Sequence, residues 1–292
     1  MNFGHLALFH AVARAGNMSR AAEELLISQP AISKQLKELE RAMGTMLFDR
    51  VTRGMRLTDA GKLLHAYSTR IFALAEEAQN AMEQLNGIER GSLIVGASTT
   101  IGVYLLPKIF VVFRKKYPQI KLELVIANSQ DIYKKLQSGE INLGLTEGVI
   151  EELDADASTF ARDELVAIAS PKHALAKKRS IPVKELVRQP FIVRETGSGT
   201  KSVVEKALAR KGLTVTPIMS LGSTEAIKRA VASGIGVAMV SALSIQLELK
   251  TRELVRLHLR DLAVDRPLYR LQIRHQTESA AAKEFMKMLM CA

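Results

Sequence analysis

The stretch FHAVARAGNMSRAAEELLISQPAISKQLKELERAMGTMLFDR, residues 9–50, predicts a series of short helices. Apolar residues recur at helical spacing up to Val12, and Gly16 is placed to end this first helix. Ser19 is a candidate N-cap for a second short helix, which we expect to extend to Leu26. The opening therefore predicts a small α-helical domain.

A third helix is expected to begin after Ser28, which can cap it, with Pro30 tolerated in its first turn. Gly44 can end this helix, whose inward apolar stripe is formed by Ile32, Leu36 and Leu39. Two short helices joined by a tight turn form a helix-turn-helix, whose second helix enters the DNA major groove with its N-terminus first.

The exposed face of the third helix carries side chains that can contact DNA: Gln29, Ser33, Lys34 and Lys37. Glutamine can form two hydrogen bonds with an adenine edge, serine can contact several bases, and lysine suits guanine or phosphate. The alternative is an ordinary pair of helices in an α domain, with the lysines on a solvated face. Spacing alone leaves both interpretations open.

The segment LFDRVTRGMRLT, residues 47–58, predicts a short β-wing around a turn at Gly54. The apolar positions of this wing are Leu47, Phe48, Met55 and Leu57. Its cations could reach phosphates or the narrower minor groove, and they are Arg50, Arg53 and Arg56.

A long helix is expected from a cap at Thr58 to about Leu85. Its apolar residues follow alternating intervals of four and three, at Ala60, Leu64, Tyr67, Ile71, Leu74, Ala78, Ala81 and Leu85. This heptad pattern is typical of a helix that pairs with another helix, so we expect a dimer contact. A helix packed on its own domain is the alternative, although it usually needs a wider apolar face.

Residues 86–91 (NGIERG) form a hinge candidate, after which short apolar runs alternate with helical segments. The first set of strands is SLIVGA, IKLELVI and INLGLT; the second is ELVAIAS, PFIVRE, TPIMSL and GVAMV. PLYRLQIR adds a late strand, and residues 277–290 a last helix. This alternation predicts a parallel sheet covered by helices, in two lobes of one αβ domain.

With these elements in place, residues 3–61 resemble the N-terminal domain of the LysR-type transcriptional regulators, nearly continuously through RGMRLTDAG. The resemblance implies an α+β multidomain chain: an N-terminal winged helix-turn-helix, a long linker helix, and a two-lobed αβ effector domain resembling periplasmic solute-binding proteins. The expected boundaries are 1–57 for DNA binding, 58–86 for the linker and dimerisation helix, 87–91 for the hinge and 92–292 for effector binding. Lobe I comprises 92–161 and 268–292, and lobe II 162–267.

The resemblance also implies roles for individual residues in DNA binding. Gln29, Pro30 and Ser33 match the base-facing start of the family's recognition helix, and Pro30 mainly fixes the helix entry. Basic positions near phosphate are matched by Lys34 and Lys37, and the arginine of the wing by Arg53. The full predicted DNA-binding set is Ser28, Gln29, Pro30, Ser33, Lys34, Lys37, Arg50 and Arg53.

Three segments of the second half follow strands and are candidates for a ligand site: 98–100, 146–148 and 194–200. Ligands bind beyond the carboxyl ends of strands in parallel αβ sheets, and helix N-termini favour anions. These segments could equally be ordinary caps and turns, but the family resemblance favours an effector site. The predicted effector-binding residues are Ser98, Thr99, Thr100, Thr146, Glu147, Arg194, Ser198, Gly199 and Thr200.

We expect a small oxyanion or carboxylate as effector, held by hydroxyls and amides. The segments hold few fixed cations besides Arg194, so a heavily phosphorylated effector is less favoured. RETGSGT, residues 194–200, resembles a segment of family members that control sulfur assimilation and carbon fixation. The expected partners are double-stranded DNA, the effector, a second copy through the linker helix, a tetramer of two dimers, and RNA polymerase.

The net charge and the single cysteine limit the kind of partner and the location that we expect. A net charge of +11 suggests a polyanionic partner, yet residues 1–90 hold 11 basic and 10 acidic side chains, so most of the excess lies elsewhere. The single Cys291 excludes an intramolecular disulfide and suggests a reducing, cytoplasmic location.

Scattered histidines and the lack of a nucleophile elbow or Walker loop argue against a catalytic site, a metal site or a cofactor. The uncharged stretch Ala230–Leu247 is interrupted by glycines and serines, so we expect a helix, a turn and a strand there and no contact with a membrane. The competing hypothesis to a DNA-binding regulator is a solute-binding module whose helical N-terminus only contacts other proteins.

Overall fold

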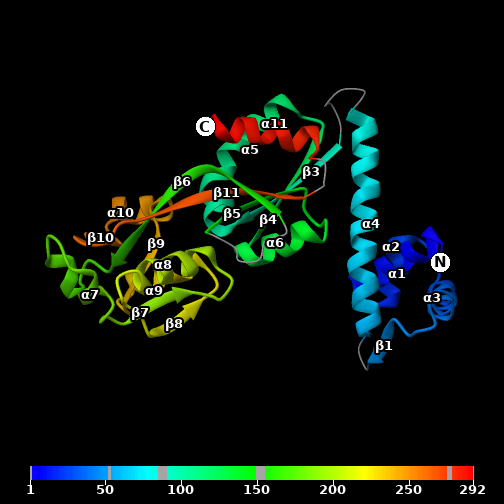
Figure 1. The fold of residues 1–292 in the computed structure, drawn as a ribbon, viewed down its shortest axis with the longest axis horizontal. Helices are drawn as coiled ribbons and strands as arrows, with labels where there is room; N and C mark the ends of the chain where they lie inside the picture. Colours follow the sequence, from blue (N-terminus) through cyan, green and yellow to red (C-terminus); the bar gives the residue numbers. More distant parts are fainter. Residues whose placement is uncertain (1, 52–53, 85–90, 149–154, 275–277, 292) are drawn as a thin grey trace. The chain divides into compact units, whose positions relative to one another are not determined.

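The computed structural model describes residues 2–51, 54–84, 91–148, 155–274 and 278–291 (Figure 1). These residues divide into two compact units. The N-terminal unit consists of Met1–Gln79 with Ser138–Glu140, and the C-terminal unit of Asn80–Gln137 with Ile141–Ala292. The predicted hinge at 87–91 falls almost wholly outside the described residues, since only Gly91 belongs to them.

Three helices open the N-terminal unit: α1 (Phe3–Ala15), α2 (Met18–Leu25) and α3 (Gln29–Met43). The predicted cap of the third helix is confirmed, because the Ser28 hydroxyl accepts a hydrogen bond from the amide of Ala31 at 3.4 Å. The predicted cap of the second helix is wrong. Asn17 performs this role, and its side-chain oxygen accepts hydrogen bonds from the amides of Ser19 and Arg20.

The wing and the long helix complete this unit. Strand β1 (Phe48–Val51) pairs antiparallel with β2 (Gly54–Leu57), as the sequence predicts. Helix α4 (Asp59–Gln84) starts where Thr58 Oγ1 accepts a hydrogen bond from the amide of Gly61 at 3.0 Å. The winged helix-turn-helix and its following long helix are therefore both present.

The apolar seam predicted for α4 divides between two surroundings. The core of this unit is formed by Leu6, Phe9, Ile32, Leu36 and Leu39 among others, and Ala60, Leu64 and Ile71 of α4 pack against it. Tyr67 and Leu74 instead keep 54% and 65% of their surface exposed. The first part of the helix thus packs on its own domain, which the heptad interpretation did not anticipate. The outward apolar stripe is formed by Leu63, Tyr67, Leu74 and Met82.

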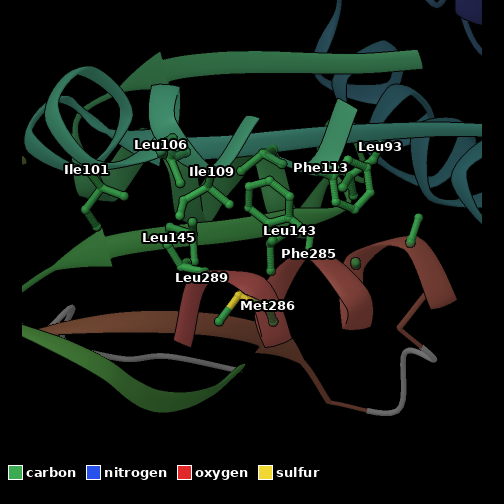
Figure 2. Packing of buried hydrophobic residues seen from close by; sticks show 14 of the residues in the cluster. Leu93, Ile101, Leu106, Ile109, Phe113, Leu143, Leu145, Phe285, Met286 and Leu289 are labelled. Atoms are coloured by element: carbon green, nitrogen blue, oxygen red, sulfur yellow. The ribbon is translucent and has the colours of Figure 1, made fainter. Parts of the chain in front are cut away.

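Lobe I of the C-terminal unit is a parallel sheet with helices. Strand β3 (Gly91–Ser98) pairs with β4 (Ile120–Ala127) and β5 (Leu143–Glu147). The helical elements are a π-helical segment (Ile101–Leu105), α5 (Leu106–Lys116), α6 (Ser129–Gln137) and α11 (Ala280–Met290). Figure 2 shows the apolar side chains of α5 and α11 packed over this sheet, among them Phe113 and Phe285.

Lobe II repeats the parallel arrangement. Strand β7 (Phe191–Arg194) lies between β8 (Pro217–Leu221) and β9 (Val237–Ser241), with α8 (Gly199–Ala209) and α9 (Thr224–Ala232) beside them. Shorter elements that the sequence analysis did not predict are α7 (Val183–Leu186), α10 (Gln246–Thr251), β10 (Val255–Leu257) and two 3-10 turns at Ala174–Lys177 and Ala242–Ile245. The stretch 230–247 holds the end of α9, a turn at Gly234 and β9, as predicted.

Two long antiparallel strands run through both lobes: β6 (Ala155–Ala169) and β11 (Val264–Ile273). They join the strands of the two lobes into one sheet, in the order β4-β3-β5-β11-β6-β9-β7-β8. The predicted lobe boundaries fall within these two strands, where Ala161 pairs with Leu268 and Arg162 with Pro267. Only the second half of β6 was predicted, because its first half, ADASTFARD, has no apolar alternation.

Candidate functional site

The start of α3 lies in a groove of about 490 Å³ in the N-terminal unit. The groove is lined by residues from the start of α2, the start of α3 and the wing, namely Asn17, Met18, Ser19, Gln29, Pro30, Ser33, Gly54 and Met55. The structure therefore brings three of the predicted DNA-contacting residues, Gln29, Pro30 and Ser33, to one hollow between helix and wing.

Three of the polar side chains predicted to contact DNA are accessible on α3. Gln29, Lys34 and Lys37 are exposed, and no hydrogen bond or ion pair within the described residues involves their side chains. Ser28 is exposed too, but its hydroxyl already caps the helix. Of the wing arginines, Arg50 lies on β1 opposite Met55, while Arg53 lies outside the described residues.

A buried carboxylate fixes the wing to α3. Glu40 is 9% exposed, and its Oε1 accepts hydrogen bonds from the backbone amides of Leu47 at 2.8 Å and Phe48 at 3.4 Å. The sequence analysis did not identify this residue, since glutamate inside a helix gives no signal of burial. Its contacts hold the start of β1 against the helix that carries the predicted base contacts.

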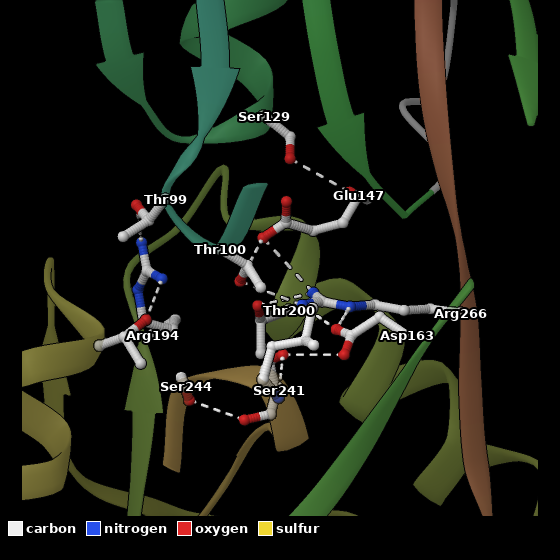
Figure 3. A network of polar contacts seen from close by, with 12 residues as sticks. Thr99, Thr100, Ser129, Glu147, Asp163, Arg194, Thr200, Ser241, Ser244 and Arg266 are labelled. Atoms are coloured by element: carbon white, nitrogen blue, oxygen red, sulfur yellow. Dashed lines mark hydrogen bonds and ion pairs between the residues drawn. The ribbon is translucent and has the colours of Figure 1, made fainter. Parts of the chain in front are cut away.

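The C-terminal unit contains a buried polar network centred on Arg266 of β11 (Figure 3). The Arg266 side chain is 0% exposed, and its Nε and Nη2 lie 2.8 Å and 2.6 Å from Oδ2 of Asp163. Its other contacts are with Thr200 Oγ1 at 2.8 Å, Thr100 Oγ1 at 3.1 Å and Glu147 Oε1 at 3.4 Å. One guanidinium thus connects strand and helix ends from both lobes.

Glu147, at the end of β5, is a fully enclosed carboxylate of this network. Its Oε1 accepts a hydrogen bond from Thr100 Oγ1 at 3.2 Å, whereas Oε2 is buried and has no hydrogen-bond partner among the described residues. Burial raises the pKa of Glu147, and the facing charges of Arg266 and Arg194 oppose that rise. The hydroxyls of Ser98 and Thr146, also at strand ends, are likewise buried without a partner in the described structure.

Arg194, at the end of β7, forms the second cationic centre. Its guanidinium donates to both carboxylate oxygens of Glu195, at 2.7 Å and 2.9 Å, and to Thr224 Oγ1 at 3.0 Å. It also lies 3.5 Å from Thr99 Oγ1, which belongs to lobe I. A predicted effector residue of each lobe is therefore in contact with one of the other lobe.

The start of α8 approaches the end of β5 very closely. A Cβ added at Gly199 would lie 1.8 Å from the carbonyl oxygen of Glu147, so only glycine fits there. Ser198 is 4% exposed and precedes this helix, but its side chain makes no capping hydrogen bond. Of the predicted residues at this helix start, Gly199 is thus placed against the end of β5, and Thr200 contacts Arg266.

The central members of this network, Arg266, Asp163 and Ser241, lie outside the predicted site. Ser241 Oγ donates to Asp163 Oδ1 at 2.8 Å. Arg194 is the one arginine or lysine of the three predicted segments, but a second cation, Arg266, reaches the same strand ends from β11. Arg266 directly precedes the predicted strand PLYRLQIR, and no local pattern indicates that it will be buried against Asp163, 103 residues away.

A further polar cluster connects the lobes beside the π-helical segment. Tyr104 OH donates to Glu225 Oε1 at 2.5 Å, and Lys228 Nζ contacts Glu225, Glu248 and Tyr104 at 2.6, 2.8 and 3.4 Å. Burial and the hydrogen bond to Glu225 raise the pKa of Tyr104 to about 12. None of these four residues belongs to the predicted site.

Comparison with known families accounts for both units. Residues 3–62 match the profile "Bacterial regulatory helix-turn-helix protein, lysR family", and residues 86–292 match "LysR substrate binding domain". The chain belongs to the LysR family of transcriptional regulators. This confirms the resemblance inferred from the sequence, with its winged helix-turn-helix and its αβ effector-binding domain. The chain is a DNA-binding regulator and not an enzyme.

Three proteins show which members of the family this chain resembles in sequence and in fold. The RuBisCO operon transcriptional regulator of Allochromatium vinosum is 35% identical over 98% of this chain and 94% of its own length. The regulatory domain of CcmR from Synechocystis PCC6803, solved with 2-PG, is 32% identical, with a TM-score of 0.65 over 69% of this chain and 97% of that one. Full-length CbnR bound to its target DNA shares the fold, with a TM-score of 0.73 at 20% identity over 99% of both chains.

Two absences concern the described residues alone. No group of three or more histidine, cysteine, aspartate or glutamate side chains there could hold a metal ion. None of the helices in this part of the chain is long and apolar enough to cross a membrane.

Proposed function

We propose that this chain regulates genes of carbon fixation and that its effector is a small anion of the phosphorylated carboxylate class, such as 2-phosphoglycolate. Two relatives support this class: one regulates a RuBisCO operon, and the CcmR regulatory domain was solved with 2-PG. The observation that carries the proposal is the set of buried hydroxyls and arginines at strand ends of both lobes (Figure 3).

In this proposal, both the hydroxyl groups and the arginines of the site bind the effector. Thr100 and Thr200 both contact Arg266, and Ser98 and Thr146 hold buried hydroxyls that lack partners among the described residues. Hydroxyls and a guanidinium are donors that suit an oxyanion. The effector would replace contacts within the network, and so change how the two lobes are held together.

On the DNA side, α3 would enter the major groove with Gln29 and Ser33 toward the base edges and Lys34 and Lys37 toward phosphates. Ser28, Pro30, Arg50 and Arg53 complete the proposed surface. We further propose that α4 pairs with α4 of a second copy through Leu63, Tyr67, Leu74 and Met82, because this apolar stripe is exposed. Two recognition helices would then face an inverted repeat, and two such dimers would form the tetramer that contacts RNA polymerase.

A gel-shift titration on the DNA upstream of the regulator's own gene tests the DNA-binding half. Gln29→Ala with Ser33→Ala should weaken specific binding by about 1–3 kcal/mol per lost base contact and relax sequence preference. Lys37→Ala is the matched comparison, because losing a phosphate contact should weaken binding to all sequences alike and lower the salt slope by about 1.

The competing proposal is a solute-binding module whose N-terminal helices contact only proteins. It predicts that the Gln29 and Ser33 substitutions leave DNA affinity and preference unchanged, and that wild-type binding is neither salt-sensitive nor sequence-dependent. The groove at the start of α3 and the exposed Gln29 and Lys34 side chains, which have no partner among the described residues, favour the DNA-binding proposal.

Thermal unfolding with a panel of anions tests the effector half. A ligand that binds only the folded protein raises stability by mass action, so 2-phosphoglycolate should raise Tm more than sulfate, acetate or a sugar phosphate. Thr100→Ala and Thr200→Ala should reduce this shift, whereas Thr214→Ala, at an exposed position of lobe II, should not. An equal shift in all three variants would exclude the proposed site.

A further inference from the structure

The network around Arg266 has more carboxylates than cations before any effector arrives. Arg266 and Arg194 face Asp163, Glu147 and Glu195, and each guanidinium is already engaged by carboxylate oxygens. An anionic effector that reaches these arginines therefore meets negative charge on the same cations. Like charges that share a buried site disfavour one another's ionised forms.

The carboxylates of Arg266 differ in how firmly their charge is held. Asp163 receives two nitrogens of Arg266 on Oδ2 and the Ser241 hydroxyl on Oδ1, so both of its oxygens are satisfied. Glu147 uses only Oε1, at 3.4 Å from Arg266 and 3.2 Å from Thr100, and its Oε2 is buried without a partner in the described structure. Glu147 is thus the carboxylate whose charge is least stabilised.

We propose, on the basis of the effector class given above, that Glu147 takes up one proton from solvent when the anionic effector binds. The proton adds to the unpartnered Oε2, where the new O–H becomes a donor for an anion oxygen. Glu147 then no longer competes for Arg266, and the network loses one negative charge as the negative effector enters. Glu147 would in this way determine the net charge of the anion that the site accepts.

The surroundings of Glu147 make it suitable for this role. The charged groups that face it are Arg266 of β11, Asp163 of β6 and Arg194 of β7. Burial already raises its pKa, and an added negative ligand beside Arg266 raises it further, since the cation's influence is then shared. Asp163 has no such unpartnered oxygen, because its Oδ2 accepts from two nitrogens of Arg266 and its Oδ1 accepts from Ser241.

Proton uptake gives binding a defined pH dependence. Effector affinity should fall as pH rises, by up to about tenfold per pH unit, over the range in which the free protein holds Glu147 ionised. Glu147→Gln replaces the carboxylate with a neutral group of the same shape, so this variant should bind more tightly at high pH and lose that part of the pH dependence.

The experiment is calorimetric titration of the full-length protein with 2-phosphoglycolate, in two buffers of different ionisation enthalpy, between pH 6 and 9. The dependence of the observed heat on buffer gives the number of protons taken up. Wild type and Glu147→Gln are compared, because protons exchanged by the ligand itself are the same for both. We expect wild type to take up about one proton more than the variant. Glu185→Gln, which changes a partly buried carboxylate that pairs with Lys178 outside the network, should match wild type.

Equal proton uptake and parallel affinity profiles in wild type and Glu147→Gln would overturn the proposal. Failure of all three proteins to bind 2-phosphoglycolate would instead contradict the proposed effector. In that case, unfolding without ligand still tests Glu147. A carboxyl with a raised folded pKa loses its contribution to stability as pH rises through that pKa, so Glu147→Gln should gain stability over wild type with increasing pH. The comparison starts at pH 4.5, the ordinary pKa of this carboxyl, and a constant difference from there upward would refute the titration of Glu147 in the folded protein.

Discussion

The two units of this regulator use polar side chains in opposite ways. On α3, Gln29, Lys34 and Lys37 are exposed and make no hydrogen bond or ion pair within the described structure, so they can contact DNA. In the C-terminal unit, Arg266 and Glu147 are buried and connected to groups of both lobes. The first arrangement gives a surface on which a partner forms new contacts without breaking existing ones. The second gives a site in which a ligand must replace contacts that already exist.

The sharpest way to break this comparison is to remove Arg266. Arg266→Ala would leave Asp163 and Glu147 buried without their cation, which should lower the free energy of unfolding by about 3–5 kcal/mol. Arg256→Ala removes an arginine that pairs with Glu164 at the surface, and about 1 kcal/mol or less is expected. Urea unfolding measures the free energy of unfolding of both variants. It is followed by circular dichroism, because the chain has no tryptophan whose fluorescence could report unfolding.

Similar losses in the two arginine variants would show that the buried network contributes no more than a surface pair. The polar groups of the two units would then differ in burial but not in their contribution to stability. A large loss in Arg266→Ala that Glu147→Gln partly restores would show in addition that Glu147 is ionised when Arg266 is absent.

The N-terminal unit was predictable because its signals are local. Ser28 and Gly44 limit α3 by residue type, and the wing follows from apolar residues around Gly54. The cap of α2 was placed wrongly because Asn17 and Ser19 are both good N-cap residues. Only the backbone decides between them, since Asn17 is extended and Ser19 is already helical.

The candidate effector site was predictable only in part, for the opposite reason. Thr100, Glu147 and Thr200 could be identified because each lies where a strand ends or a helix begins. Arg266 could not, because its partners Asp163 and Thr100 are 103 and 166 residues away. Long-range pairing of charges becomes visible only when β6 and β11 lie side by side, and no local pattern records it.

Glu40 is the exception that sharpens the comparison, because it is a buried and paired carboxylate within the DNA-binding unit. Glu40→Ala would leave the amides of Leu47 and Phe48 without their acceptor, at about 1–3 kcal/mol. Amide hydrogen exchange at these two residues should accelerate, and DNA binding should weaken as the wing loses its position. Glu38→Ala, an exposed residue of the same helix, is the control. Unchanged exchange at Leu47 would mean that apolar packing alone holds the wing.

A partly buried polar contact of the N-terminal unit connects α1 to α4. His10 Nδ1 lies 3.1 Å from Ser68 Oγ, and its ring packs against His65 and Phe72 with centroid distances of 5.2 Å. Burial, with a smaller effect of His65 and Arg14, lowers the pKa of His10 from 6.5 to about 4. The folded protein therefore binds this proton less readily than the unfolded chain does.

This difference predicts the smallest effect of the three. His10 contributes stability above pH 6.5 that is lost progressively as pH falls toward 4, on the order of 1–2 kcal/mol after allowance for its partial exposure. His10→Phe keeps a ring against Phe72 but does not titrate, so unfolding midpoints between pH 7 and 4.5 should fall less steeply than in wild type. His258→Phe, at an exposed position of the C-terminal unit, should leave the slope unchanged. If the His10→Phe and wild-type curves run parallel, the contact between α1 and α4 is insensitive to protonation. Protonation of this N-terminal contact would then contribute less to stability than the charges around Arg266 do. That result would agree with the difference described between the two units.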